Sequence, residues 1–222
     1  MIIAIANQNG GSGKTIVANN LALLRARTGR KVLLLDADPK QSSTNWGCER
    51  SAAGVRPRIA ARALAGRALE QELDTLRRHY NDIVIDTEGR DTAESRAALN
   101  AARLVVVPVS AEQADLASQY KLIARLNAAR MFNPHLRVLF VAVANEGEAD
   151  EADADDMAAI RAYAARVMSA TLAGTVIHEQ LAAHRACGRG RCVCDGGSDG
   201  ASIGDPGAAA EMQALYKEVF IP

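Results

Sequence analysis

Short apolar runs recur along the chain, and they alternate with longer stretches in which apolar residues return at helical spacing. Continuous apolar runs are typical of strands that are buried on both faces, and the periodic stretches are typical of amphipathic helices. We expect strands at 2–6, 31–36, 55–61, 82–86, 103–108, 137–144 and 171–177. We expect helices at 16–28, 68–80, 111–130, 157–168 and 206–220. This alternation predicts an α/β fold, with a mainly parallel twisted sheet of about seven or eight strands and helices on both faces.

A glycine-rich turn, NQNGGSGKT, follows the first strand and leads directly into the first helix. Its glycines let backbone N–H groups approach phosphate oxygens, and the free N–H groups of the helix start point into the same turn. Lys14 adds a positive charge, and the Thr15 hydroxyl suits a magnesium ion. The spacing fits the variant phosphate-loop pattern GG-x-GK-[ST] and predicts a P-loop NTPase fold. The predicted nucleotide-binding residues are Asn9, Gly10, Gly11, Ser12, Gly13, Lys14, Thr15 and Ile16.

Three carboxylates stand at the ends of predicted strands. Asp36 ends the second strand and Asp38 follows it, and Asp86 ends the strand at 82–86. In open parallel sheets, ligands bind in the crevice at the carboxyl ends of the strands. Each Asp alone would also fit a cap of the next loop or helix. Three of them beside a phosphate loop favour a nucleotide and metal site.

With these motifs the chain resembles the ParA/MinD family of deviant Walker-A ATPases, nearest to small plasmid-partition ParA proteins. The matching pieces span nearly the whole chain and are NQNGGSGKT, VLLLDADPKQSSTNW, DIVIDTEGR, LVVVPVS and GDPGAAAEMQALYKEV. The resemblance implies a slow, partner-stimulated ATPase that forms a homodimer with ATP. Such a switch segregates plasmid or chromosomal DNA, or positions another large cargo, through an adaptor protein of ParB type.

The resemblance also implies roles for single residues, with ATP and Mg²⁺ as the cofactors. Lys14 holds phosphates, Thr15 and Asp86 serve Mg²⁺ directly or through water, and Asp36 stands beside them as a further metal-site residue. Asp38 positions the attacking water, so Lys14 and Asp38 are the predicted catalytic residues. Asn145, at the end of the strand at 137–144, either reads the adenine edge or lies in a plain turn.

Two positions depart from the family's pattern. Asn9 stands where the family carries a lysine that reaches across the dimer, and Ile16 replaces a second hydroxyl after Thr15. Lys40 and Arg90 are the candidates to replace the missing cation. An alternative is therefore a weakly or non-hydrolysing, nucleotide-dependent scaffold or regulator.

The segment near 184–194 suggests a second alternative, a metal-cluster carrier of the same superfamily. His184, Cys187, Cys192 and Cys194 give the spacing H-x2-C-x4-C-x-C, which does not match the usual paired zinc spacing. The other interpretation is a mobile loop with reduced cysteines.

Two loops, 39–46 and 87–91, are the predicted switch loops beside the phosphates.

Chain length and net charge limit the number of domains and the ways in which the protein could bind DNA. The 222 residues, 49% of them hydrophobic, suffice for one domain spanning 1–222. The 26 basic and 26 acidic residues cancel, so non-specific DNA binding would need a local patch. Arg185, Arg189 and Arg191 are the first candidate patch. The arginines within 50–67 are the second, although a solvated face also fits them.

No segment has the length of apolar sequence that a membrane span needs, and the chain starts with a core strand rather than a leader. We therefore expect no membrane contact and a cytoplasmic protein, with nucleoid association if DNA is bound.

Overall fold

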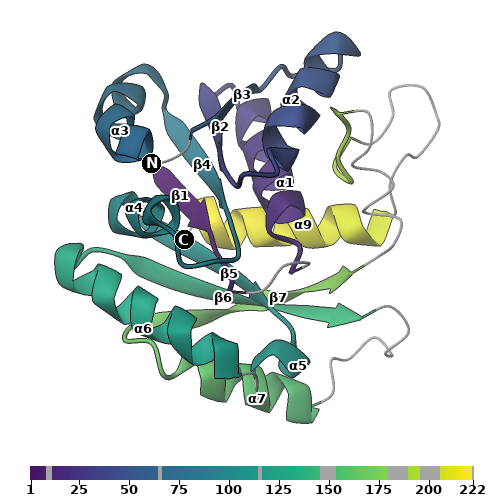
Figure 1. The fold of residues 1–222 in the computed structure, drawn as a ribbon. Coiled ribbons are helices and arrows are strands. Elements are labelled where there is room, and N and C mark those ends of the chain that lie inside the picture. Colours follow the sequence, from purple (N-terminus) through teal and green to yellow (C-terminus); the bar gives the residue numbers. More distant parts are fainter. Residues whose placement is uncertain are drawn as a thin grey trace.

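The computed structural model describes residues 1–8, 12–64, 67–114, 117–145, 154–179, 190–195 and 206–221. At its centre is a seven-stranded parallel sheet with the strand order β3-β2-β4-β1-β5-β6-β7 (Figure 1). The strands are β1 (Ile2–Ile5), β2 (Val32–Ala37), β3 (Ala60–Ala63), β4 (Asp82–Thr87), β5 (Leu104–Val109), β6 (Arg137–Asn145) and β7 (Ala170–Glu179). The predicted fold class is confirmed.

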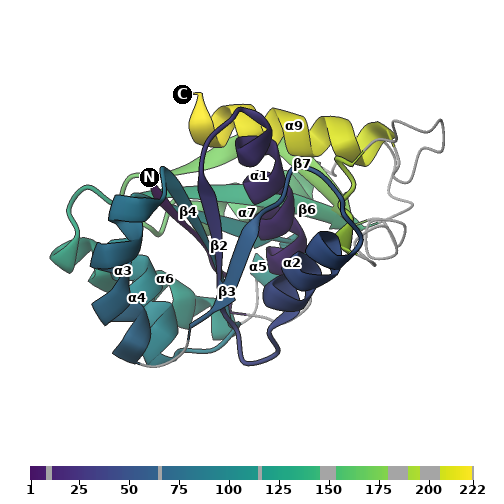
Figure 2. The same cartoon turned by 90° about the horizontal axis from the view of Figure 1, so that it is seen from above.

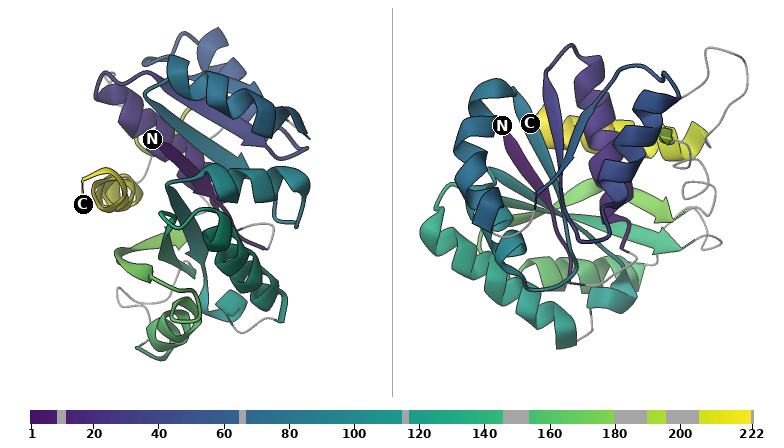
Figure 3. Two further views of the ribbon diagram at one scale, coloured as in Figure 1. Left: turned by 90° about the vertical axis from the view of Figure 1, so that its left-hand side faces the viewer. Right: turned by 45° about the horizontal axis from the view of Figure 1, so that its top comes forward.

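Helices cover both faces of this sheet (Figures 2 and 3). One face carries α1 (Lys14–Arg27), α2 (Ser42–Ala52) and α9 (Pro206–Phe220). The other carries α3 (Arg67–His79), α4 (Ala93–Ala101), α5 (Ala111–Ala114), α6 (Ala117–Phe132) and α7 (Ala154–Ala164). Because side chains alternate along a strand, β1 sends Ile3 and Ile5 into one apolar cluster and Ala4 into the other.

The predicted first switch loop is mostly helical, which corrects the expectation for 39–46. Helix α2 begins at Ser42, and the Asp36 carboxylate accepts a hydrogen bond from the Thr44 backbone N–H at 2.8 Å. This carboxylate satisfies one of the free N–H groups at the helix start, so the polar sequence SSTN forms the first turn of a helix. Only a short connection at 38–41 remains between β2 and α2.

Other boundaries also differ from the prediction. The strand expected at 55–61 is β3 at 60–63, because Pro57 has no N–H to give to a sheet. The helix expected at 111–130 appears as α5 and α6, with residues 115 and 116 outside the described part. The helix expected at 157–168 is α7, which lies earlier along the chain.

Arg50 does not lie on a solvated face, which corrects one interpretation of the arginine-rich stretch. Its side chain is 1% exposed and makes a bidentate pair with Asp195, at 2.6 and 3.0 Å. Its other N–H groups donate to the carbonyls of Pro57, Arg56 and Gly190. The stretch that was considered for DNA contact therefore supplies a core residue.

The segment 190–195, here called the clasp, packs on α1 and α2. Trp46 Nε1 donates to the Arg191 carbonyl, and the Cys194 N–H donates to the Asn20 side chain. A Cβ on Gly190 would lie 2.0 Å from the Arg50 backbone nitrogen, so this approach requires glycine. The clasp thereby joins the connection between β7 and α9 to two helices of the phosphate-loop side.

Among the described residues, no helix is both long and apolar enough to cross a membrane.

Candidate functional site

The site lies at the carboxyl end of the sheet, where β1 turns into α1. Gly13 has φ +71°, in the left-handed region, and Lys14 is the first helical residue. Glycine adopts this backbone conformation without strain, so the chain turns sharply from strand to helix at Gly13. The predicted residues Ser12, Lys14, Thr15 and Ile16 lie around this turn. Asn9, Gly10 and Gly11 lie outside the described residues, and their roles stay predictions.

Asp86, at the end of β4, lies at the centre of a hydroxyl cluster. Thr15 Oγ1 donates to Asp86 Oδ2 at 2.8 Å. The Ser43 hydroxyl lies 2.8 Å from the same oxygen and 2.8 Å from the Asn19 amide oxygen. These contacts bring together the phosphate loop, β4 and the first turn of α2. Hydroxyl and carboxylate oxygens are the ligands that Mg²⁺ prefers, so this donor set fits a magnesium ion.

Burial shifts the titration of both charged groups here. Asp86 is 1% exposed, and loss of water around its carboxylate raises its pKa to about 6. Burial likewise lowers the pKa of Lys14, although the carboxylates of Asp86 and Asp38 oppose that shift. A divalent cation beside Asp86 and phosphates beside Lys14 would favour the charged forms of both groups. The residues therefore fit a site for an anionic ligand with a cation.

Asp36 and Asp38 adopt different roles from each other. Both Asp36 oxygens accept backbone N–H groups, from Asp38 at 3.1 Å and from Thr44 at 2.8 Å. Burial raises the pKa of Asp36. Asp36 pairs with Asp86 across neighbouring strands, so it lies beside the proposed metal site, where it also holds the start of α2. Asp38 is half-buried and accepts the Lys40 N–H at 2.9 Å.

Arg125 is a residue of this region that the sequence reasoning missed. It projects from α6, is 9% exposed, and donates to Gln8 at 2.9 Å and to Ser95 at 2.6 Å. Its Nε lies 3.5 Å from Asp91 in the second predicted switch loop. Burial lowers its pKa. The available signal was one arginine within the apolar stripe of a predicted helix.

Ser43 is a second missed residue, because 39–46 was expected to be a loop.

Of the two predicted replacement cations, Lys40 is exposed and Arg90 has an exposed side chain whose Nε lies 3.1 Å from Glu88.

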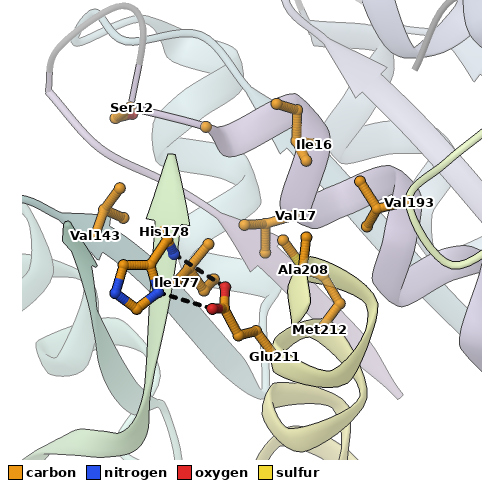
Figure 4. Close-up of a pocket in the computed structure, with 11 residues that line it drawn as sticks. Ser12, Ile16, Val17, Val143, Ile177, His178, Val193, Ala208, Glu211 and Met212 are labelled. Carbon is orange, nitrogen blue, oxygen red and sulfur yellow. Dashed lines mark hydrogen bonds and ion pairs between the residues drawn. The ribbon is translucent and has the colours of Figure 1, made fainter. Parts of the chain in front are cut away.

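An apolar pocket of about 470 Å³, including its open mouth, adjoins the start of α1 (Figure 4). Ser12, Gly13 and Ile16 form one wall, with side chains from β6, β7, the clasp and α9 around the rest. His178 and Glu211 form a polar pair in this lining. His178 Nδ1 lies 2.7 Å from Glu211 Oε1, and the His178 backbone N–H donates to Glu211 Oε2 at 3.0 Å. Its apolar walls and one polar pair suit a flat heterocycle attached to phosphates.

The strand ends place Asn145 at the edge of this pocket. Asn145 is the last residue of β6, two positions beyond the pocket residue Val143, and it pairs with Glu179 next to His178. Its side chain lies outside the described part, so its contact with a base stays a prediction.

The late cysteines do not form a metal site among the described residues, where no group of three potential ligands comes together. Cys192 and Cys194 belong to the clasp and are buried in the apolar core at 0% and 4% exposure, which corrects the interpretation of them as part of a mobile loop. His184 and Cys187 lie outside the described residues, as do Arg185 and Arg189 of the first candidate DNA patch.

Several known proteins are similar in sequence. The chromosome-partitioning ATPase Soj of Thermus thermophilus is 34% identical over 168 residues, covering 64% of this chain and 68% of Soj. Maintenance of carboxysome distribution protein A of Gloeobacter kilaueensis is 38% identical over 119 residues, covering 52% of each chain.

Solved structures share the fold at low sequence identity. The structure of apo McdA from Cyanothece aligns with a TM-score of 0.75 at 17% identity, over 98% of both chains. The septum site-determining protein MinD from Pyrococcus horikoshii, complexed with Mg-ADP, aligns with a TM-score of 0.65 at 17% identity, over 99% of this chain and 95% of that one.

The profile of the CobQ/CobB/MinD/ParA nucleotide binding domain matches residues 3–193, which include the phosphate loop and all three strand-end carboxylates. The parallel sheet, the glycine turn at its carboxyl edge and the hydrogen bond from Thr15 to Asp86 agree with that match. This chain therefore belongs to the CobQ/CobB/MinD/ParA nucleotide-binding family.

Proposed function

We propose that the protein is an ATPase that binds ATP with Mg²⁺ at the carboxyl edge of the sheet. The observation that carries this proposal is the cluster of Thr15, Ser43 and the buried Asp86 beside Lys14. It combines a cation, a carboxylate and two hydroxyls at the start of a helix, which are the groups needed for a phosphate chain with a metal ion. The metal-nucleotide complex of MinD supports the same assignment by relationship.

Four residues of the chain would have separate roles in binding and hydrolysing ATP. Lys14 offers an ammonium group to phosphate oxygens, and Thr15 and Asp86 offer oxygen ligands to the cation. Asp38, half-buried and close enough to raise the pKa of Lys14, would hold a water molecule through its carboxylate. A bound Mg²⁺ ion supplies neutralisation of the negative charge that develops on the phosphates. Catalysis would come from positioning and charge neutralisation.

We assign the apolar pocket beside Ser12 to the base. Glu211 only accepts hydrogen bonds when ionised, so it suits the exocyclic amine of adenine and disfavours the carbonyl of guanine at that position. Glu211→Gln should therefore reduce the preference for ATP over GTP and leave the affinity for tripolyphosphate unchanged. An unchanged preference would move the base to another part of the site.

The biological role that we propose is partition or positioning of a large cargo by an ATP-dependent homodimer. The names of two relatives support it, one a chromosome-partitioning ATPase and the other a protein of carboxysome distribution. An adaptor of ParB type and non-specific DNA are the proposed partners. The weakly or non-hydrolysing regulator stays the second candidate, because Asn9 stands at the position of the family's cross-dimer lysine.

Calorimetry with Mg-ATP tests the central proposal. Lys14→Ala should abolish detectable binding, because it removes the ammonium group at the helix start that would face several phosphate charges. Lys217→Ala, which removes an exposed lysine on α9, is the matched control and should bind as wild type. Near-native affinity of Lys14→Ala would overturn the site assignment. Light scattering with ATP then tests dimerisation. Measured phosphate release distinguishes an ATPase from a regulator that binds ATP without hydrolysing it.

A further inference from the structure

Two long stretches of the chain contain no acidic residue. Positions 117–145 and 157–178 carry no Asp and no Glu, although the chain has 26 acids and 26 lysines and arginines in total. These stretches form α6, most of α7 and the strands that follow them. All charged side chains within these two stretches are therefore basic, although Asp155 and Asp156 lie in the first turn of α7, just before the second stretch.

Large apolar side chains are exposed on the same region. Tyr120, Met131, Phe132 and Met168 are 55%, 81%, 80% and 63% exposed. The other two large apolar side chains that are exposed in the described residues, Met1 and Ile221, lie close to the chain ends. Met and aromatic residues together with Arg are enriched in protein interfaces, and acids are depleted there. This composition is that of a contact surface.

These side chains form one continuous face. The Arg166 guanidinium lies 4.9 Å from the centre of the Tyr120 ring. Asn127, between Tyr120 and Met131 on the same side of α6, bonds the Arg166 carbonyl and the Met168 N–H at 3.2 Å each. We call this surface the α6 face: the exposed arc of α6 from Tyr120 to Phe132, with Arg166 and Met168. Helix α6 itself lies along the outside of the molecule, at the lower left of Figure 1.

The shape of the α6 face suits a helix. Ala124 and Ala128 are exposed in the middle of the arc, between larger side chains at its two ends. Small residues at the middle of a helix surface let a second helix approach closely. Lys121 and Arg166 are exposed at one end, and Arg137 is exposed just beyond the other.

We propose that the α6 face docks an acidic amphipathic helix of a partner protein. The apolar arc would receive the partner's apolar side, and the basic rim would meet its carboxylates. Nucleic acid fits the charge but gives no reason for four exposed apolar side chains, since phosphate contacts are polar. The opposite side of α6 sends Arg125 to Gln8 and Asp91, so a docked helix would lie one helix away from the nucleotide site.

Selection from a displayed library of randomised 18-residue peptides tests this proposal on the full chain without nucleotide, so the result does not depend on ATP binding. Enriched peptides should carry acids and an apolar stripe at helical spacing. Their affinity should fall at least tenfold for Met131→Asp and for Arg166→Glu. Ile221→Asp, which changes an apolar side chain 66% exposed outside the α6 face, should bind as wild type.

A charge exchange completes the test. Peptides with lysine in place of the acids should bind Arg166→Glu better than they bind wild type. The proposal is overturned if no enriched peptide depends on the α6 face, or if the enriched peptides are basic. It is also overturned if face-dependent binding appears only with a 24-base-pair DNA duplex or with phosphatidylglycerol vesicles.

Discussion

Replacing Arg50 with alanine should destabilise the protein more than any exposed-charge substitution. The guanidinium is 1% exposed, bonds both Asp195 oxygens and three backbone carbonyls, and lies 5.3 Å from the centre of the Trp46 ring. Arg50→Ala removes all of these contacts and leaves the Asp195 carboxylate buried at 6% exposure. Arg27 Nη2, at 3.2 Å from Asp195, is the remaining cation and is itself partly exposed.

The expected loss can be estimated from the burial. Removing one partner of a buried ion pair costs about 3–5 kcal/mol, because the other charge stays without water and without a partner. For a domain of this size, 1 kcal/mol shifts Tm by about 2–4 °C, so Tm should fall by about 6–20 °C. Arg62→Ala is the control: its pair with Glu72 is 49% and 37% exposed, and such pairs contribute about 0–1 kcal/mol.

Thermal and urea unfolding of the purified variants measure this difference. A double variant, Arg50→Met with Asp195→Leu, should lose less than the sum of the single losses, since it leaves no buried charge unpaired; Arg27, which also loses Asp195, is 37% exposed. If Arg50→Ala costs no more than Arg62→Ala, the clasp does not hold α2 in place and the reasoning is wrong. Additive losses in the double variant would show that the two side chains act independently.

Further predictions concern the nucleotide site. In the metal-free protein, the Asp86 pKa of about 6 exceeds the ordinary 3.8, so its contribution to stability is complete below about pH 4 and is lost as pH rises through 6. Asp86→Asn should flatten the Tm–pH curve between about pH 4 and 6 and should abolish the Mg²⁺ requirement of ATP binding. A Tm–pH curve parallel to that of the wild type would contradict the assignment. Asp38→Ala should bind ATP normally and hydrolyse it at least tenfold more slowly, as phosphate release would show. Asn9→Lys should raise turnover of the ATP-bound dimer, and an unchanged rate would mean that another cation already acts there. Arg125→Met should lower ATP affinity severalfold in calorimetry, because Gln8 loses its partner, whereas unchanged affinity would make Arg125 purely structural.

Local signals in the sequence were sufficient for most of the fold. The patterns predicted six of the seven strands closely, and most of these are buried on both faces and therefore continuously apolar; β7, at the sheet edge, is only partly buried. The strand at 60–63 was misplaced because its sequence, AARA, is short, half-exposed and carries no such run. The first turn of α2 was missed because the side chain that accepts its Thr44 N–H is Asp36, eight residues earlier and across a turn.

By itself, the sequence determined the phosphate loop and the strand-end carboxylates, because a glycine turn between a strand and a helix is a local pattern. Only the tertiary structure decided which distant groups meet that loop. Ser43 reaches Asp86, Arg125 reaches Gln8, and Arg50 pairs with Asp195 far along the chain. The sequence around an arginine does not show whether its side chain is solvated or buried. Its environment depends on carboxylates and carbonyls that long-range packing brings to it.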